Sequence, residues 1–242
     1  MSKIFEEKLS ALGLTLSERQ LEQFDRYYEL LIEWNKVMNL TGIVEYEEVN
    51  EKHFIDSLSI VKVLDMNKVE TVIDVGTGAG FPGLPLKIAF PHLKVTLLDS
   101  LNKRIKFLDT VIEELGLEDI HTIHGRAEDY ARQEAYREQY DLAVSRAVAN
   151  LSSLSEYCLP YVRVGGTFLP YKSGEIEEET AEAATAVKVL GGRFRGGTQK
   201  AVTKFRLPGS DISRSFVQIE KIKNTGKKFP RKSGMPTKEP IK

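Results

Sequence analysis

The sequence is poor in several features that mark broad classes of protein. It has one cysteine, Cys158, so no disulfide can form within the chain, and a reducing compartment suits it. No apolar run approaches the roughly 18 residues that a membrane-spanning helix needs, and residues 1–7 lack the apolar core of a signal peptide. The 4 histidines have no cysteine partners at metal-ligand spacing. We therefore expect a soluble, cytoplasmic protein without a membrane partner or a metal.

Net charge is nearly absent as well, at −1, but the charges are distributed unevenly. Residues 1–50 contain 5 Lys and Arg against 10 Asp and Glu, and residues 51–192 contain 15 against 22. Residues 193–242 contain 14 against 3 and are strongly basic. A basic end is typical both of a solvated tail and of a segment that binds a polyanion such as nucleic acid. Composition leaves both interpretations open.

The first 66 residues have the spacing of a small helical layer. Residues 17–20 form a capping box, apolar residues recur at helical spacing as far as Met38, and residues 39–42 end the element. A second helix is predicted over residues 47–64, where His53 and Asp56 stand three residues apart. These two side chains either face a nucleic acid or pair with each other, and we favour the pairing. The layer is too thin for a core of its own, so we predict a helical cap, residues 1–66, packed on the following domain.

Strands and helices alternate from residue 70 onward. The predicted strands cover residues 71–75, 94–98, 120–123, 141–145 and 167–171, with helices beginning near Pro82, Asn102, Ala127 and Asn150. This alternation predicts a parallel sheet with right-handed crossovers. After a further helix near residues 176–190, residues 200–207 and 215–223 are joined by a Pro-Gly-Ser turn, which predicts a terminal antiparallel hairpin. We place this α/β domain at residues 67–222. Residues 223–242 are predicted to form a basic, extended tail, with Phe229 available to stack on a base.

The most informative motif is a glycine-rich loop directly after the first strand. Asp74 is followed by Gly76, Gly78 and Gly80 at alternate positions and then by a predicted helix. Glycines in such a loop allow the backbone to approach a ligand at a helix N-terminus. Asp99, at the end of the second strand, is placed to hold a ribose hydroxyl. The motif therefore predicts an adenosine-containing cofactor, although Asp99 or its neighbour could instead cap the next helix.

The identity of the cofactor depends on the register of this loop. Residues 78–83 formally match the dinucleotide fingerprint G-x-G-x-x-G, but counted from Gly76 the third glycine would fall at Phe81, whose ring blocks close packing. Asp74 is unusual for a nicotinamide site and suits a cationic methionyl ammonium. The pattern Asp-x-Gly-x-Gly-x-Gly resembles motif I of the Rossmann-like S-adenosylmethionine (SAM) methyltransferases, as does the terminal hairpin. A nicotinamide enzyme and purely structural glycines are the alternatives.

Longer motifs make the resemblance more specific. The chain resembles the bacterial GidB/RsmG family at residues 53–58, 74–85, 97–100, 103–108, 125–128, 144–147 and 229–236. That family methylates N7 of one guanine in the 16S ribosomal RNA (rRNA) of the small subunit. The resemblance implies SAM as cofactor and a seven-stranded, mostly parallel Rossmann-like sheet with an antiparallel last strand and an N-terminal helical cap.

The resemblance also implies the residues of the site. The cofactor contacts would be Asp74, Gly76, Gly78, Gly80, Phe81, Asp99, Ala127, Glu128 and Arg146. Ala127 and Glu128 follow the third strand, where this class holds adenine, although Glu128 could simply be a first-turn helix acid. Arg146 borders the acceptor site. Guanine N7 attacks a methyl group with its own lone pair, so we assign no catalytic residue.

Cations at the C-terminal ends of the strands predict a surface that binds RNA phosphates. The candidates are Lys103, Arg104, Arg126, Arg146 and Lys172, joined by Arg231 and Lys232 of the tail. The alternative for each is an ordinary salt bridge. We expect 16S rRNA as the partner, either free or in an assembling small subunit. Two other functions remain open: a ribosome-assembly or RNA-binding factor with a structural SAM, and a small-molecule methyltransferase.

Overall fold

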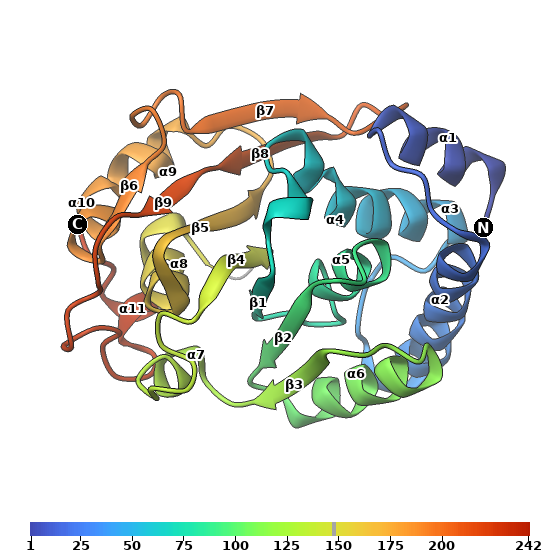
Figure 1. The fold of residues 1–242 in the computed structure, drawn as a ribbon, viewed down its shortest axis with the longest axis horizontal. Coiled ribbons are helices and arrows are strands. Elements are labelled where there is room, and N and C mark those ends of the chain that lie inside the picture. Colours follow the sequence, from blue (N-terminus) through green and yellow to red (C-terminus); the bar gives the residue numbers. More distant parts are fainter. Residues whose placement is uncertain (147–148) are drawn as a thin grey trace.

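A computed structural model describes residues 1–146 and 149–242, and its centre is a mixed β-sheet (Figure 1). Ala147, the last residue of one motif quoted above, lies outside the described residues. The strands are β1 (Thr71–Val75), β2 (Lys94–Asp99), β3 (Ile120–His124), β4 (Tyr140–Arg146), β5 (Val162–Lys172), β6 (Gly192–Phe194), β7 (Val202–Arg206), β8 (Ser213–Val217) and β9 (Ile219–Lys221).

The strand order is β3-β2-β1-β4-β5-β8-β7, and β9 pairs with both β5 and β6. The first five strands of this order are parallel, and β8 and β9 run antiparallel to β5. The predicted parallel sheet with an antiparallel last strand is therefore confirmed. Nine described strands replace the predicted seven, because Gln218 divides the last strand into β8 and β9 and the short β6 adds to the edge.

Helices cover both faces of the sheet (Figure 1). The α-helices are α1 (Lys3–Ala11), α2 (Glu18–Met38), α3 (Tyr46–Val49), α4 (Asp56–Leu58), α5 (Gly83–Ala89), α6 (Asn102–Glu114), α7 (Ala127–Tyr130), α8 (Leu151–Cys158), α9 (Glu177–Glu182), α10 (Ala184–Val189) and α11 (Met235–Lys238). Elements α1–α6 lie on one side and α7–α11 on the other, and the two chain ends lie at opposite sides of the view. None of the helices described is long and apolar enough to cross a membrane.

The alternation of side chains along β1 explains this two-sided covering. Val72 belongs to the apolar cluster under α1–α6, whereas Ile73 and Val75 belong to the cluster under α7–α11. Successive side chains of a strand point to opposite faces, so an apolar strand covered on both faces fills two cores. Its C-terminal edge then remains for a ligand.

The long N-terminal helix α2 packs on helices α5 and α6, which cover the sheet, and Gln20 donates to the carbonyls of Ile88 and Ala89 at the end of α5. The thin helical layer therefore packs on the following domain, as predicted. The capping box of α2 is present between Ser17 and Gln20, and the helix ends at Asn39, which adopts a left-handed conformation (φ 50°). The predicted second helix is not uniform. It runs from α3 through a π-helical turn, Asn50–Ile55, into α4 and then a 3₁₀ turn, Ser59–Lys62. A π turn shifts the side chains that follow it and often lies at a functional site.

The C-terminal segment differs from the predicted extended tail. Phe229 is buried, so it does not offer its ring to a base, and residues 235–238 form α11. Lys221 anchors the start of the segment: its buried ammonium donates to the carbonyls of Leu159 and Val162 and pairs with Glu138. Desolvation lowers the pKa of Lys221 to about 8. The composition suggested a solvated tail because the segment has few apolar residues, and the backbone hydrogen bonds that dock it cannot be read from composition.

Candidate cofactor and acceptor site

The loop after β1 adopts a backbone that only glycine takes easily. Gly76, Gly78 and Gly80 have φ of 73°, 63° and 97°, in the left-handed region. The amide N–H groups of Gly76 and Thr77 donate to the carbonyl of Leu98, which ties the loop to the end of β2. A Cβ on Gly80 would also collide with Leu84 and the Tyr27 hydroxyl. The loop is therefore fixed from below by α2 and α5.

Asp74 lies buried under this loop with one carboxylate oxygen uncompensated. Its Oδ2 accepts hydrogen bonds from the Thr77 hydroxyl (2.7 Å) and the Gly83 amide (2.8 Å). Its Oδ1 has no partner among the described residues. Burial raises the pKa of Asp74 to about 6. A buried carboxylate oxygen without a partner is costly, so Asp74 suits a cationic group brought by a ligand.

Asp99, at the end of β2, is held by three donors. Its Oδ2 accepts from the Gly78 amide (3.0 Å) and the Arg104 guanidinium (3.1 Å), and its Oδ1 accepts from the Leu101 amide (2.9 Å). Residue 101 itself is the N-cap of α6 and makes no side-chain cap, so neither Asp99 nor Ser100 is the capping residue. A carboxylate accepts about four hydrogen bonds, which leaves about one further position for a ligand hydroxyl.

Three cavities lie in a row along this edge of the sheet. A strand-end cavity of about 400 Å³ is lined by Asp99, Arg126, Ala127 and Glu128, among others. A loop cavity of about 400 Å³ lies against Gly76–Ala79 and Phe81, and it shares Gly76, Asp99 and Ser100 with the strand-end cavity. A basic cavity of about 710 Å³ contains Lys52, Lys172 and Arg214, and it shares His53 and Arg146 with the loop cavity. An elongated ligand in the first two cavities would therefore end beside the third.

Arg146 forms the wall between the loop cavity and the basic cavity. Its guanidinium donates to Asp56 Oδ2 (3.0 Å) and His53 Nδ1 (3.1 Å) and lies 5.0 Å from the centre of the Phe81 ring. Asp56 Oδ1 accepts from Arg214 Nε at 2.7 Å, so one buried carboxylate orients two arginines. The predicted pairing of His53 with Asp56 is wrong: both bind Arg146 instead.

His53 is held as a neutral ring. Burial, together with the charge of Arg146, lowers the pKa of His53 to about 3. Its Nδ1 accepts from Arg146, so the proton lies on Nε2, which is 2.8 Å from the Thr41 hydroxyl. The ring stacks on Phe81 with centroids 4.4 Å apart, and Tyr27 stacks on Phe81 at 5.4 Å. Phe81 is thus a fixed apolar wall of the loop cavity.

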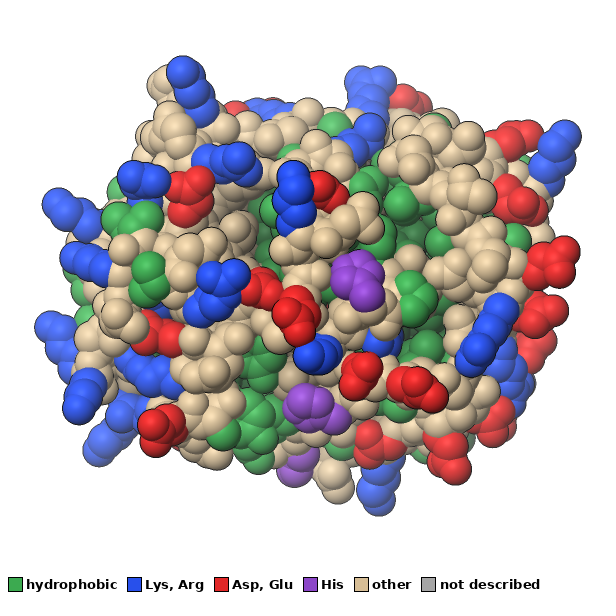
Figure 2. Space-filling view, viewed as in Figure 1, with side chains coloured by type: hydrophobic (Ala, Val, Ile, Leu, Met, Phe, Trp, Pro, Cys, Tyr) green, Lys and Arg blue, Asp and Glu red, His purple; other side chains and the backbone are tan. Residues whose placement is uncertain are grey.

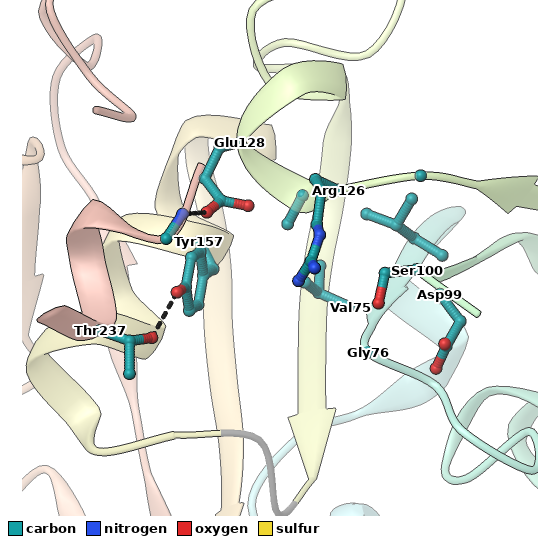
Figure 3. A pocket seen from close by; sticks show the side chains of 12 residues that line it. Val75, Gly76, Asp99, Ser100, Arg126, Glu128, Tyr157 and Thr237 are labelled. Atoms are coloured by element: carbon teal, nitrogen blue, oxygen red, sulfur yellow. Dashed lines mark hydrogen bonds between the residues drawn. The ribbon is translucent and has the colours of Figure 1, made fainter. Parts of the chain in front are cut away.

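At the other end of the row, the C-terminal segment meets Glu128. The amide N–H of Gly234 donates to Glu128 Oε1 at 2.7 Å, and Gly234 and Thr237 line the strand-end cavity (Figure 3). Tyr157, on α8, bonds the Thr237 hydroxyl at 2.5 Å. The side chain of Arg126 extends into the same space from the strand end (Figure 3).

Comparison with known proteins assigns this arrangement to a family. Residues 20–203 match the GidB family model, described as rRNA small subunit methyltransferase G. A relative from Lachnoclostridium phytofermentans, named Ribosomal RNA small subunit methyltransferase G, is 54% identical over 98% of this chain and 96% of its own. A relative of the same name from Bacillus cereus is 50% identical over 98% of this chain and 97% of its own. The chain belongs to the GidB family.

Solved structures agree on the fold alone. A SAM-dependent methyltransferase from Aquifex aeolicus superposes with a TM-score of 0.51, covering 72% of this chain and 93% of its own at 16% identity. The methyltransferase SibL in its apo form gives 0.50, covering 66% of this chain and 53% of its own at 18% identity. The predicted Rossmann-like methyltransferase fold is confirmed.

The cations that were predicted to contact RNA in this GidB chain fall into two groups. Arg104, Lys172 and Arg231 each pair with a carboxylate, those of Asp99, Glu179 and Glu156. Lys103, Arg126 and Lys232 are exposed. Figure 2 shows many Lys and Arg side chains on the side of the C-terminal elements, and more Asp and Glu on the side of α1–α3. RNA contact stays a prediction for these six residues and for Arg146, which pairs with Asp56.

Several residues of the site gave no signal in the sequence. Tyr27, Thr41 and Arg214 reach it from α2, from the loop after α2 and from β8, and no motif spacing connects them to the glycine loop. Gly234 stood inside the quoted motif at residues 229–236, but composition gave it no role. Among the described residues, no group of three or more potential ligands is placed to hold a metal.

Proposed function

We propose that this GidB chain transfers a methyl group from SAM to N7 of one guanine in 16S rRNA, acting in the cytoplasm on free rRNA or on an assembling small subunit. The observation that carries the proposal is the 54% identity, along nearly the whole chain, to a relative named as a small-subunit rRNA methyltransferase. The identity of the atom, guanine N7, follows from the family that the motifs resemble.

The residues of the first two cavities fit this cofactor. SAM supplies an electrophilic methyl group on a sulfonium. Asp74 is not among the lining residues of either cavity, but its unpaired Oδ1 beneath the loop would attract the ammonium end, and Asp99, which lines both cavities, would accept from the ribose. Glu128 and the backbone of Ala127 line the cavity at the other end, where an adenine would lie. The left-handed glycines leave the loop without side chains that would obstruct this path.

The basic cavity fits a nucleotide acceptor. Lys52, Lys172 and Arg214 line it, and Arg146 separates it from the loop cavity. Guanine N7 is a bare acceptor lone pair, so no side chain has to remove a proton before transfer. Arg146, Asp56 and His53 hold one another rigidly, which suits positioning rather than proton transfer.

The test is transfer of label from SAM. The protein is incubated with labelled SAM and, in separate samples, deproteinised 16S rRNA, small subunits and an unrelated RNA. We expect one labelled 7-methylguanine in the 16S sequence, located by cleavage at the modified base. Label only in protein or small molecules would contradict the RNA substrate. RNA binding without any transfer would favour an assembly factor.

A further inference from the structure

The last segment of the chain forms a wall of the cofactor site. We call residues 229–238 the C-terminal strap. The strap lies along α8, where Ser153, Glu156 and Tyr157 occupy one face at helical spacing. The Ser153 hydroxyl donates to the carbonyl of Pro236 at 2.7 Å, and Glu156 accepts from both the amide and the guanidinium of Arg231.

The strap presents two different sides. The backbone at Gly234 and the side chain of Thr237 line the strand-end cavity. The side chains of Lys232 and Lys238 are exposed to solvent. Solubility and RNA contact do not account for the bond between the strap's backbone and Glu128, a buried carboxylate that lines this cavity.

The hydrogen bond between Gly234 and Glu128 makes the two oxygens of this carboxylate different. Oε1 is occupied by the Gly234 amide at 2.7 Å, whereas Oε2 has no hydrogen-bond partner within residues 1–146 and 149–242. Figure 3 shows this second oxygen directed away from the strap, on the cavity side. A carboxylate oxygen so placed accepts a hydrogen bond and cannot donate one.

We propose that the strap is a positioning element of the cofactor site: through Gly234 it fixes Glu128 so that the free oxygen selects a 6-amino purine over a 6-oxo purine. The proposal rests on the proposed function, because it assumes an adenosyl ligand in this cavity. An amino group donates to the free oxygen. A carbonyl at the same position would face it lone pair to lone pair and leave both unpaired, which a buried site rejects strongly.

The first test compares two glycine variants. Gly234 has a φ of 83°, so Gly234→Ala strains the backbone although no neighbour obstructs the new methyl group. Gly226→Ala is the matched control, because Gly226 also has open space around it but no left-handed φ. We measure dissociation constants of 5′-methylthioadenosine and 5′-methylthioinosine by calorimetry. Wild type and Gly226→Ala are expected to prefer the 6-amino ligand by about tenfold or more, and Gly234→Ala to lose most of this preference.

The second test is Glu128→Gln, which keeps the shape and exchanges one oxygen for an NH₂ group. If the Gly234 amide holds the side-chain oxygen, the NH₂ group must face the ligand, and the preference reverses toward the 6-oxo purine. A freely rotating glutamine would turn its oxygen to the ligand and keep the original preference. Retention of that preference would overturn the proposal.

The third test needs no variant and covers the case that Gly234→Ala does not fold. Trypsin sites at Lys228, Arg231 and Lys232 lie in or beside the strap. Saturating 5′-methylthioadenosine is expected to slow cleavage there several-fold and to leave cleavage at Lys3 unchanged. Equal cleavage with and without ligand, or equal purine preference in all variants, would overturn the role of the strap while SAM binding and methyl transfer persist. Failure of wild type to bind SAM would refute the proposed function itself.

Discussion

The N-terminal cap and the C-terminal strap both contact the cofactor site, but different forces hold them there. The cap packs through buried aromatic rings: Phe54 lies against Phe5, Phe24, Tyr27 and Phe81 with centroids 5.0–6.4 Å apart. The strap docks mainly through hydrogen bonds and the ion pair of Arg231 with buried Glu156, and Phe229 is the one aromatic ring that it buries. The burial of apolar area that holds the cap is non-directional, whereas a polar dock depends on each donor and acceptor.

This difference shows that a docked segment is not always evident from its composition. An apolar stripe indicates a buried face, because removal of apolar area from water stabilises the packing of that face. A lysine-rich, proline-rich segment shows no such stripe, although its backbone, Arg231 and the single aromatic ring of Phe229 fix it in place. The following predictions test the comparison from the largest expected effect to the smallest.

Removal of the central ring of the cap should have the largest effect. Phe54→Ala is expected to lower the free energy of unfolding by about 3–5 kcal/mol, because Phe54 is fully buried among four other rings. Urea unfolding followed by circular dichroism measures it. The control Val37→Ala concerns a side chain that is 79% exposed and should change stability little. A loss below about 1 kcal/mol for Phe54→Ala would contradict aromatic packing as the force that holds the cap.

Breaking the ion pair of the strap comes next. Arg231→Ala leaves the Glu156 carboxylate buried without its partner, which should cost about 2–3 kcal/mol, below the range for fully buried pairs because Arg231 is partly exposed. Chemical denaturation measures the loss. The double variant Arg231→Ala with Glu156→Ala should recover part of it, because no buried charge remains. A double variant whose loss equals the sum of the single losses would show that the pair is not coupled.

Asp99 lies between the two regions and should affect the cofactor more than the fold. Asp99→Ala is expected to weaken SAM binding by about 1–2 kcal/mol, through the lost hydrogen bond to the ribose and the lost acceptor for the Gly78 amide of the loop. Calorimetry measures the dissociation constant. Asp109→Ala, at an exposed acid on α6, is the matched control and should bind as wild type does. An unchanged affinity in Asp99→Ala would refute the ribose assignment.

The carboxyl group of Asp74 should make cofactor affinity depend on pH. Its folded pKa of about 6 is raised by burial, so the group is charged above pH 6 and becomes neutral as pH falls through that value. A cationic ammonium is favoured by the charged form, so affinity should fall by about fivefold between pH 6 and pH 5. Asp74→Asn should bind more weakly at neutral pH and lose this slope. A slope that persists in the variant would assign it to another group.

The exposed cations of the strap should have the smallest effect. Lys232→Ala is expected to weaken RNA binding by a few-fold and to reduce the slope of log affinity against log salt by about one. Titration at several salt concentrations measures both. Lys3→Ala, on the acidic side of the molecule, should leave the slope unchanged. Equal slopes for both variants would place the RNA elsewhere.

The sequence predicted the elements that depend on local residue pattern, but it did not predict contacts between residues that are distant in the chain. Strand β1 was predicted at its observed bounds, because five apolar-rich residues followed by alternate glycines have few other conformations. The π turn before Asp56 was not, since a single extra residue in a helix leaves the spacing almost unchanged. Arg214 lies 158 residues beyond Asp56 in the chain, and only the sheet order brings the two together.

The strand-end cavity also has a consequence for the order in which the chain is synthesised. The strands that form its floor leave the ribosome first, and the strap that forms its wall follows everything on which it packs. A growing chain that has folded as far as β9 would therefore hold the glycine loop but lack Gly234 beside Glu128. Full cofactor affinity would then appear late, with the 21 residues that follow β9, and a message that stops near residue 226 would yield a folded sheet that binds the cofactor weakly.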